Sequence, residues 1–139
     1  MKKLLILILT LTVTNAHAWG YNAEKEARKN LKRTDAQVCE KLRGYMQWSN
    51  TDAAEDMRLE LVAREAFSPR ELKGLIWGYK INGFVGFSKK AMECRFILNR
   101  EYSSRSRGWI YEHYSTLDHW AGFKTVIFVN GKVHTTQEF

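Results

Sequence analysis

The chain has 139 residues and a net charge of +7, and 45% of its residues are hydrophobic. That length suits one domain with a real hydrophobic core. Lysines and arginines are mixed with acids along most of the chain, which is typical of a solvated surface and argues against a nucleic-acid groove.

The first 18 residues have the pattern of a cleaved signal peptide. A basic start precedes an apolar run, Leu4–Val13, that is too short to span a bilayer. Residues 15–18, Asn-Ala-His-Ala, end in the small-x-small pattern that signal peptidase reads. We expect cleavage after Ala18, which leaves residues 19–139 as a single domain in the periplasm or outside the cell. No cysteine stands at the cleavage point, so no lipid anchor is expected.

The first half of the mature chain, residues 22–80, predicts helices. Residues 23–33 are rich in helix formers, and Thr34 or Asp35 can cap a second helix. Residues 48–52 supply a break and a new cap for a third helix. Ser68–Glu71, which reads Ser-Pro-Arg-Glu, is a capping box that begins a fourth helix. The apolar residues expected to face inward are Val38, Leu42, Tyr45, Met46, Met57, Leu61, Val62, Leu72, Leu75, Ile76 and Tyr79.

The second half, residues 84–139, predicts one short helix and then strands. Ser88 can cap the helix, and Phe84 and Phe87 either plug a helix–sheet junction or form the lip of a groove. Strands are expected at 95–102, 108–114, 124–129 and 132–138, the last two around an Asn130-Gly131 hairpin turn. The fold class is therefore α+β, with N-terminal helices followed by an antiparallel meander of three or four strands.

Cys39 and Cys94 are the two cysteines of the chain. In an oxidising compartment an isolated pair is more often bonded than free, and no Cys-x-x-Cys spacing suggests a redox or metal pair. A Cys39–Cys94 disulfide is expected.

Residues 86–137 resemble the SmpA/OmlA family of BamE-like envelope domains. The resemblance rests on the order and spacing of four short motifs, which are Gly86-Phe87-Ser88, Asn99-Arg100, Trp109-Ile110-Tyr111 and Phe128-Val129-Asn130-Gly131-Lys132. It implies a small α/β envelope domain that acts by binding other proteins. A secreted β-lactamase inhibitor uses a similar layout, so the resemblance also allows an inhibitor.

One strand of the second half is unusually aromatic. Trp109, Tyr111 and His113 alternate onto one face, and Trp120 follows in the next loop. The simpler interpretation is that Trp109, Tyr111 and His113 cover the helices. The functional interpretation is an exposed aromatic platform for a partner protein.

Residues 100–108 are expected to form a loop that carries Arg100, Arg105 and Arg107 among serines. Arginine makes bidentate contacts with carboxylates and phosphates. The loop is either a soluble hairpin tip or a docking loop for an acidic protein, an anionic lipid headgroup or a glycan. Nucleic acid is not expected as a partner in the envelope.

Neither a metal site nor a catalytic set is expected. The candidate ligands are His113, His119, His134, Glu112 and Asp118, but no His-x-His or His-Glu-x-x-His spacing is present. No Gly-x-Ser-x-Gly elbow and no cysteine beside a base point to nucleophilic catalysis. No cofactor is expected, and an unrecognised hydrolase is the minor alternative.

The sequence thus predicts a periplasmic or secreted protein-binding module, with an accessory role in envelope assembly as one version of that function. The alternative is an inhibitor of a secreted or periplasmic enzyme, such as a lysozyme-type hydrolase. The residues expected to contact a partner are Arg100, Arg105, Arg107, Trp109, Tyr111, His113 and Trp120.

Overall fold

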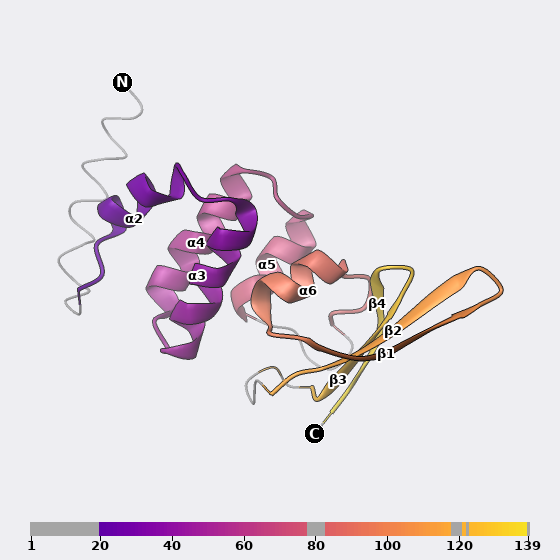
Figure 1. Cartoon of the computed structure of the whole chain (residues 1–139). Helices are drawn as coiled ribbons and strands as arrows, with labels where there is room; N and C mark the ends of the chain where they lie inside the picture. The colour runs from indigo at the N-terminus through magenta and orange to yellow at the C-terminus, as the bar shows by residue number, and fades with distance from the viewer. Residues whose placement is uncertain (1–19, 78–82, 118–120, 122, 139) are drawn as a thin grey trace. The chain divides into compact units, whose positions relative to one another are not determined.

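The computed structural model describes residues 20–77, 83–117, 121 and 123–138. In these ranges five helices precede a four-stranded antiparallel sheet (Figure 1), which confirms the predicted α+β class. The predicted signal peptide, Tyr79 and Trp120 lie outside the described residues.

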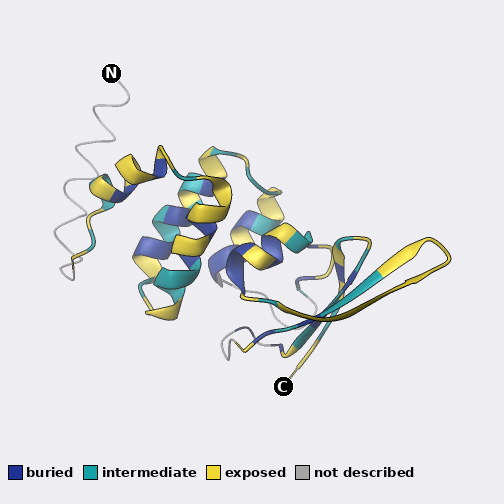
Figure 2. Cartoon of the chain, viewed as in Figure 1, coloured by how far each residue is buried: buried dark blue, intermediate teal, exposed yellow. Residues whose placement is uncertain are grey.

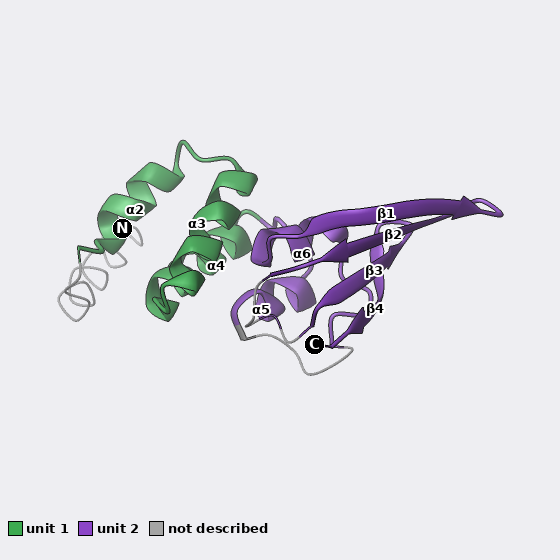
Figure 3. Ribbon diagram, turned by 60° about the horizontal axis from the view of Figure 1, so that its bottom comes forward, with its two compact units in different colours: residues 1–64 green, residues 65–139 purple. Residues whose placement is uncertain are grey.

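The chain divides into two compact units, residues 1–64 and 65–139 (Figure 3). The sequence placed the change from the helical part to the α/β part between residues 80 and 84. In the structure the fourth predicted helix belongs to the same unit as the sheet.

The first unit contains α2 (Ala23–Asn30), α3 (Asp35–Gln47) and α4 (Thr51–Ala63). Asn22, Thr34 and Asn50 cap the three helices, and Thr34 forms a full capping box with Gln37. The fully or almost fully buried apolar residues of this unit are Val38, Cys39, Leu42, Ala53, Ala54, Met57 and Leu61.

One inward position predicted for this unit is wrong. Val62 is exposed, because it lies one residue, or about 100° around the helix, from the buried Leu61. Tyr45 and Met46 are both half-buried. The buried stripe of α4 instead contains Ala53 and Ala54, whose small side chains allow close packing.

Arg64 ties the end of α4 to the segment that joins α2 and α3. Its guanidinium donates to the carbonyl oxygens of Asn30 at 2.6 Å and Arg33 at 2.8 Å, and it forms an ion pair with Asp35 at 3.0 Å. These contacts hold the C-terminus of α4 beside the segment that follows α2.

The second unit begins with α5 (Pro69–Trp77) and α6 (Lys89–Arg95), and one carboxylate serves both helix starts. The Glu71 carboxylate accepts hydrogen bonds from the backbone of Ser68 at 3.1 Å and of Ser88 at 2.6 Å. The Ser88 hydroxyl in turn accepts from the backbone of Ala91, in the first turn of α6. Both predicted caps are confirmed.

The sheet consists of β1 (Asn99–Ser106), β2 (Trp109–Ser115), β3 (Thr125–Val129) and β4 (Lys132–Gln137), in the spatial order β1-β2-β3-β4. Two-residue turns, Arg107-Gly108 and Asn130-Gly131, join β1 to β2 and β3 to β4. Both residues of each turn have positive φ, between 51° and 82°, as a type I′ hairpin requires.

One face of this sheet packs into the core of the second unit, where Phe84 and Phe87 plug the junction between helix and sheet. The members of the core cluster are Phe84, Phe87, Ala91, Met92, Phe96, Tyr114, Ala121, Phe123, Val126, Phe128 and Val133. In contrast, β1 is exposed along its length (Figure 2).

The strand predicted at 95–102 begins four residues too early, and the loop predicted at 100–108 is wrong. Arg95 ends α6, Phe96 is buried in the core, and β1 starts only at Asn99. β1 then continues to Ser106, so most of the expected loop is strand and only Arg107 and Gly108 form the turn.

Cys39 and Cys94 are both disulfide-bonded, in agreement with the predicted bond. Within the described residues, no helix has the length and the apolar composition needed to cross a membrane.

Candidate functional site

The aromatic residues of β2 lie on the sheet face that is opposite to the core. Residues paired across an antiparallel ladder share a face. Tyr102 pairs with His113, Ser104 with Tyr111 and Ser106 with Trp109, and the ladder continues from Tyr111 and His113 to Val129 and Ile127 of β3. We call this set the outer face; its members are Tyr102, Ser104, Ser106, Trp109, Tyr111, His113, Ile127 and Val129.

The core face is made by the alternate residues. Tyr114 pairs with Val126 and Glu112 with Phe128, and Tyr114, Val126 and Phe128 belong to the core cluster. The simpler interpretation of the sequence, in which Trp109 and its neighbours cover the helices, is therefore wrong.

The outer face is open to solvent at its aromatic end. Tyr102 and Trp109 are 56% and 52% exposed, and Tyr111 and His113 are half-buried. The ring of Tyr102 stacks on the imidazole of His113, with 4.0 Å between centroids and 21° between planes. The two rings therefore support each other, and with the exposed Trp109 they give the outer face an aromatic surface.

The end of the β1–β2 hairpin extends beyond β3 (Figure 1). The ladder between β2 and β3 stops at Tyr111, whereas the ladder between β1 and β2 continues to Trp109. We call residues 104–111 the hairpin tip. Arg105 and Arg107 are both exposed there, one in β1 and one in the turn.

The three predicted arginines do not form one cluster. Arg100 lies near the opposite end of β1 from the turn, five residues or roughly 17 Å along the strand from Arg105. It pairs in the ladder with Tyr114 and donates a hydrogen bond to the hydroxyl of Ser103. The tip therefore carries two of the three positive charges.

Glu112 has a structural contact on the core face. Its carboxylate forms an ion pair with Lys89 at 3.0 Å and accepts a hydrogen bond from the Tyr114 hydroxyl at 3.1 Å. The hydrogen bond from Lys89 lowers the pKa of Glu112 below its ordinary value. Since Glu112 and His113 point to opposite faces, they do not converge on one ion.

The remaining metal candidates do not complete a site in the described part of the chain. His134 lies exposed in β4, next to the irregularity in its pairing with β3, and Asp118 and His119 lie outside the described residues. No group of three or more His, Cys, Asp or Glu side chains with the spacing of metal ligands occurs among residues 20–77, 83–117, 121 and 123–138.

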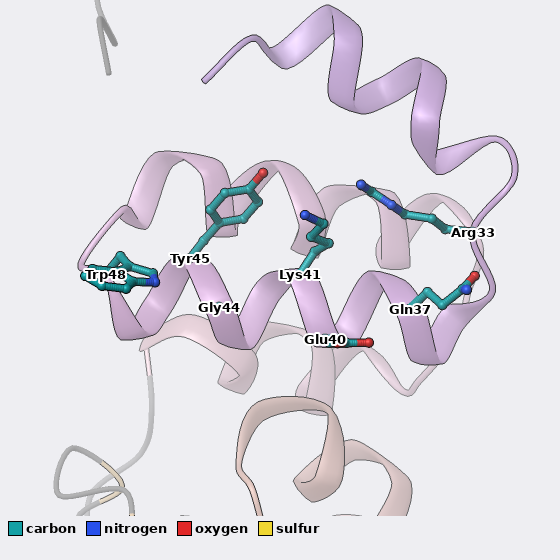
Figure 4. A pocket seen from close by; sticks show the side chains of 7 residues that line it. All are labelled: Arg33, Gln37, Glu40, Lys41, Gly44, Tyr45 and Trp48. Atoms are coloured by element: carbon teal, nitrogen blue, oxygen red, sulfur yellow. The ribbon is translucent and has the colours of Figure 1, made fainter. Parts of the chain in front are cut away.

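A second candidate site is an open groove along α3 in the first unit, with a volume of about 520 Å³ (Figure 4). It is lined by Arg33, Gln37, Glu40, Lys41, Gly44, Tyr45 and Trp48. Gly44 leaves room in the middle of the groove, because a Cβ there would meet nothing within 4 Å. Trp48, at the end of α3, is 82% exposed.

One of the side chains that line this groove, Arg33, already makes contacts within the first unit. Arg33 donates to the Glu26 carboxylate at 2.7 Å and to the side chain of Asn30 at 2.9 Å. Burial alone would raise the pKa of Glu26, but the hydrogen bond and charge of Arg33 outweigh it and hold that pKa below its ordinary value. Burial, reinforced by the negative charge of Glu26, raises the pKa of Tyr45 to about 12.

The groove was not predicted from the sequence. Gln37, Lys41, Gly44 and Trp48 recur at spacings of three and four, which places them on one side of a helix. That spacing is visible in the sequence, but a polar stripe of this kind is more often only a solvated helix face. Lys41, Glu40 and Trp48 are the groups that it offers to a small polar ligand.

The outer face and the hairpin tip thus contain every predicted contact residue that the structure describes except Arg100. Comparison of the chain with protein-family models, with curated proteins and with solved structures gives no match. The resemblance of residues 86–137 to the SmpA/OmlA family accordingly stays a prediction.

Proposed function

We propose that the protein is a protein-binding module of the cell envelope, and that it contacts its partner through the outer face and the hairpin tip. The observation that carries this proposal is the exposure of Trp109 and Tyr102 on the face opposite to the core. Tryptophan and tyrosine contribute a disproportionate share of the energy of protein interfaces, because each buries a large area and fixes few torsions.

The compartment is part of the same proposal. The signal-peptide pattern of residues 1–18 and the disulfide-bonded state of both cysteines support a periplasmic or secreted protein. On the resemblance to the SmpA/OmlA family, we propose that the protein uses this binding activity in an accessory role in envelope assembly.

The test is crosslinking and capture from envelope extract with the exported protein and two matched variants. Trp109→Ala removes the exposed indole of the outer face. Trp48→Ala removes an even more exposed indole from the other unit. We expect the first change to weaken partner capture by roughly thirtyfold, the effect of losing a hot-spot side chain, and the second to leave it unchanged.

Equal capture by the parent and Trp109→Ala would refute the aromatic surface as the binding site. Loss of capture by Trp48→Ala alone would move the site to the groove on α3.

A second candidate function is inhibition of a secreted or periplasmic hydrolase of the lysozyme type. The observation that favours it is the hairpin tip, which extends beyond β3 and exposes Arg105 and Arg107. Glycoside hydrolases use a pair of carboxylates in a cleft, and a basic tip complements such a cleft. A lysozyme assay on cell-wall suspensions tests it. The candidate fails if a large excess of the protein leaves the rate of lysis unchanged.

A further inference from the structure

We infer that the partner adds an extended segment to the free edge of β1, and that this segment alternates apolar and acidic side chains. The inference rests on the proposed function, since it assigns a binding mode and a partner chemistry to the same surface. It goes further because it derives the binding mode from the backbone of β1, and the partner chemistry from the charge and the side chains along that edge.

The backbone of β1 is available for pairing. β1 is the end strand of the sheet, and all eight of its residues are exposed. Opposite Arg105, the N–H of Ile110 donates to the Asn130 side chain at 2.9 Å, and the Ile110 carbonyl accepts from the Asn130 backbone at 2.9 Å. Both groups of Ile110 therefore point away from β1.

In an antiparallel ladder the two residues of a pair either bond each other twice or both point outward. Arg105 consequently directs its N–H and carbonyl to the open side of β1. Ser103, two residues earlier, follows the same alternation. These four backbone groups match the bonding pattern of an added strand.

Natural edge strands are often protected by charges, prolines or bulges. Here the bulge lies at one end, between Arg100 and Tyr102, and β1 contains no proline. From Tyr102 to Ser106 the pairing with β2 is regular, so five residues offer an uninterrupted edge. Strand addition of this kind draws its affinity from main-chain bonds and its specificity from alternate side chains.

The charge of the edge specifies an acidic residue opposite Arg105. Residues 102–111 include Arg105 and Arg107 and no aspartate or glutamate. Opposite charges directly across two strands stabilise their pairing. A carboxylate on the added segment would lie beside Arg105 on the same face.

The outer face specifies apolar residues on either side of that acid. Ser104 and Ser106 lie between the open edge and the rings of Tyr111 and Trp109. Because serine is small, a large apolar side chain opposite each serine can reach across it to the aromatic ring. The resulting pattern, apolar-acidic-apolar, reads the same in both strand directions, so it holds for parallel and antiparallel addition.

A second copy of this chain does not supply that pattern. The acid of β1 is Glu101, which lies in the bulge and accepts a hydrogen bond from the Ser115 hydroxyl. The whole chain has a net charge of +7, and cleavage after Ala18 removes Lys2 and Lys3, so residues 19–139 carry 7 − 2 = +5; this charge disfavours pairing of two identical basic edges. The occupant that fits is therefore an acidic segment of another protein.

The experiment measures binding of a fluorescein-labelled nine-residue peptide of alternating valine and glutamate to the full exported protein, by fluorescence anisotropy. We expect the same peptide with lysine in place of glutamate to bind at least about tenfold more weakly. In an added strand, every second N–H of the peptide points toward β1. We expect a valine–glutamate peptide that is N-methylated at these amides to lose affinity by a similar factor, because each methyl group removes a main-chain hydrogen bond.

Two variants test the protein side. Ser103→Pro removes an N–H that points to the open edge and is not needed for pairing with β2, a position where edge strands tolerate proline. Ser103→Ala is the matched control. The proline variant should bind the valine–glutamate peptide about tenfold more weakly than the alanine variant, which should match the parent.

Equal binding of the methylated and unmethylated peptides, or of the two Ser103 variants, overturns strand addition. A dimer of the parent protein in sedimentation that Ser103→Pro dissociates also overturns it, because a second copy would then occupy the edge. The methylated peptide needs no variant, so the test remains valid if Ser103→Pro fails to fold.

The same measurements separate this inference from the proposed function. If Trp109→Ala abolishes partner capture while Ser103→Pro and peptide methylation change nothing, the binding surface stands and strand addition falls. If Trp109→Ala leaves capture intact while both edge changes abolish peptide binding, the edge site stands and the aromatic surface falls.

Discussion

Replacing Glu71 with glutamine should destabilise the second unit, because one carboxylate holds the first turns of both α5 and α6. One oxygen accepts from the Ser68 backbone at 3.1 Å and the other from the Ser88 backbone at 2.6 Å. A glutamine has a single acceptor oxygen, so one of these N–H groups would face an NH₂ group. A hydrogen bond to a charged group contributes about 1.5–3 kcal/mol.

We therefore expect Glu71→Gln to lower the free energy of unfolding by about 2 kcal/mol at pH 7. For a unit of this size the melting temperature should fall by about 10 °C. Burial pushes the pKa of Glu71 upward, but hydrogen bonds from Ser88 and Ser68 outweigh it and hold the pKa below its ordinary value of 4.5. The stability from such a group is present above the ordinary pKa and is lost as the pH falls through the lowered one.

The difference between the parent and Glu71→Gln should thus be large at pH 7 and small near pH 3. Glu26 and Glu112 also have lowered pKa values, but they titrate in both proteins and cancel in the comparison. The assay is urea unfolding at both pH values, with the exposed Glu138→Gln as control. An unchanged midpoint at pH 7, or a penalty of equal size at pH 3, would refute the role given to this carboxylate.

Three further outcomes are expected. N-terminal sequencing of the exported protein should show cleavage after Ala18, and a retained leader in a membrane fraction would contradict this. Neither Cys39 nor Cys94 should react with a maleimide in the native, unreduced protein, and replacing both with serine should lower stability by about 4 kcal/mol in the chain-entropy model. Replacing Arg105 and Arg107 with serine should change stability by less than about 0.5 kcal/mol, yet slow association with the partner and flatten its salt dependence. Unchanged association rates at two salt concentrations would remove both arginines from the interface.

Features that depend on a few neighbouring residues could be predicted from the sequence. The caps at Thr34, Ser68 and Ser88 and the Asn130-Gly131 turn each follow from local hydrogen bonding or from a required positive φ. Such features leave the same signal in the sequence whatever packs around them.

β1 could not be predicted in this way. Its sequence, Asn-Arg-Glu-Tyr-Ser-Ser-Arg-Ser, shows no alternation because every residue is exposed. The strand exists because its backbone pairs with β2, and backbone bonds leave no pattern of side chains. The predicted strand instead began at the apolar run just before β1, Phe96–Leu98, although Phe96 belongs to the core.

The sequence also did not predict which face of the sheet packs against the core. Alternation shows that Trp109, Tyr111 and His113 share one face, and that Tyr114 lies on the other. It does not say which face meets the helices, because both sets are large and partly apolar. Only the pairing of Tyr114 with Val126, and of Phe128 with Val133, identifies the buried side.

The order of the strands has a consequence for the time course of folding. Each strand of the sheet pairs with its neighbour in the sequence, so the sheet has low contact order and should form within milliseconds. Single hairpins close in about 1–10 μs, whereas disulfides form over seconds to hours. Oxidation of Cys39 and Cys94 therefore comes after the sheet has formed, and a newly made, still reduced chain already presents the edge of β1 to its surroundings.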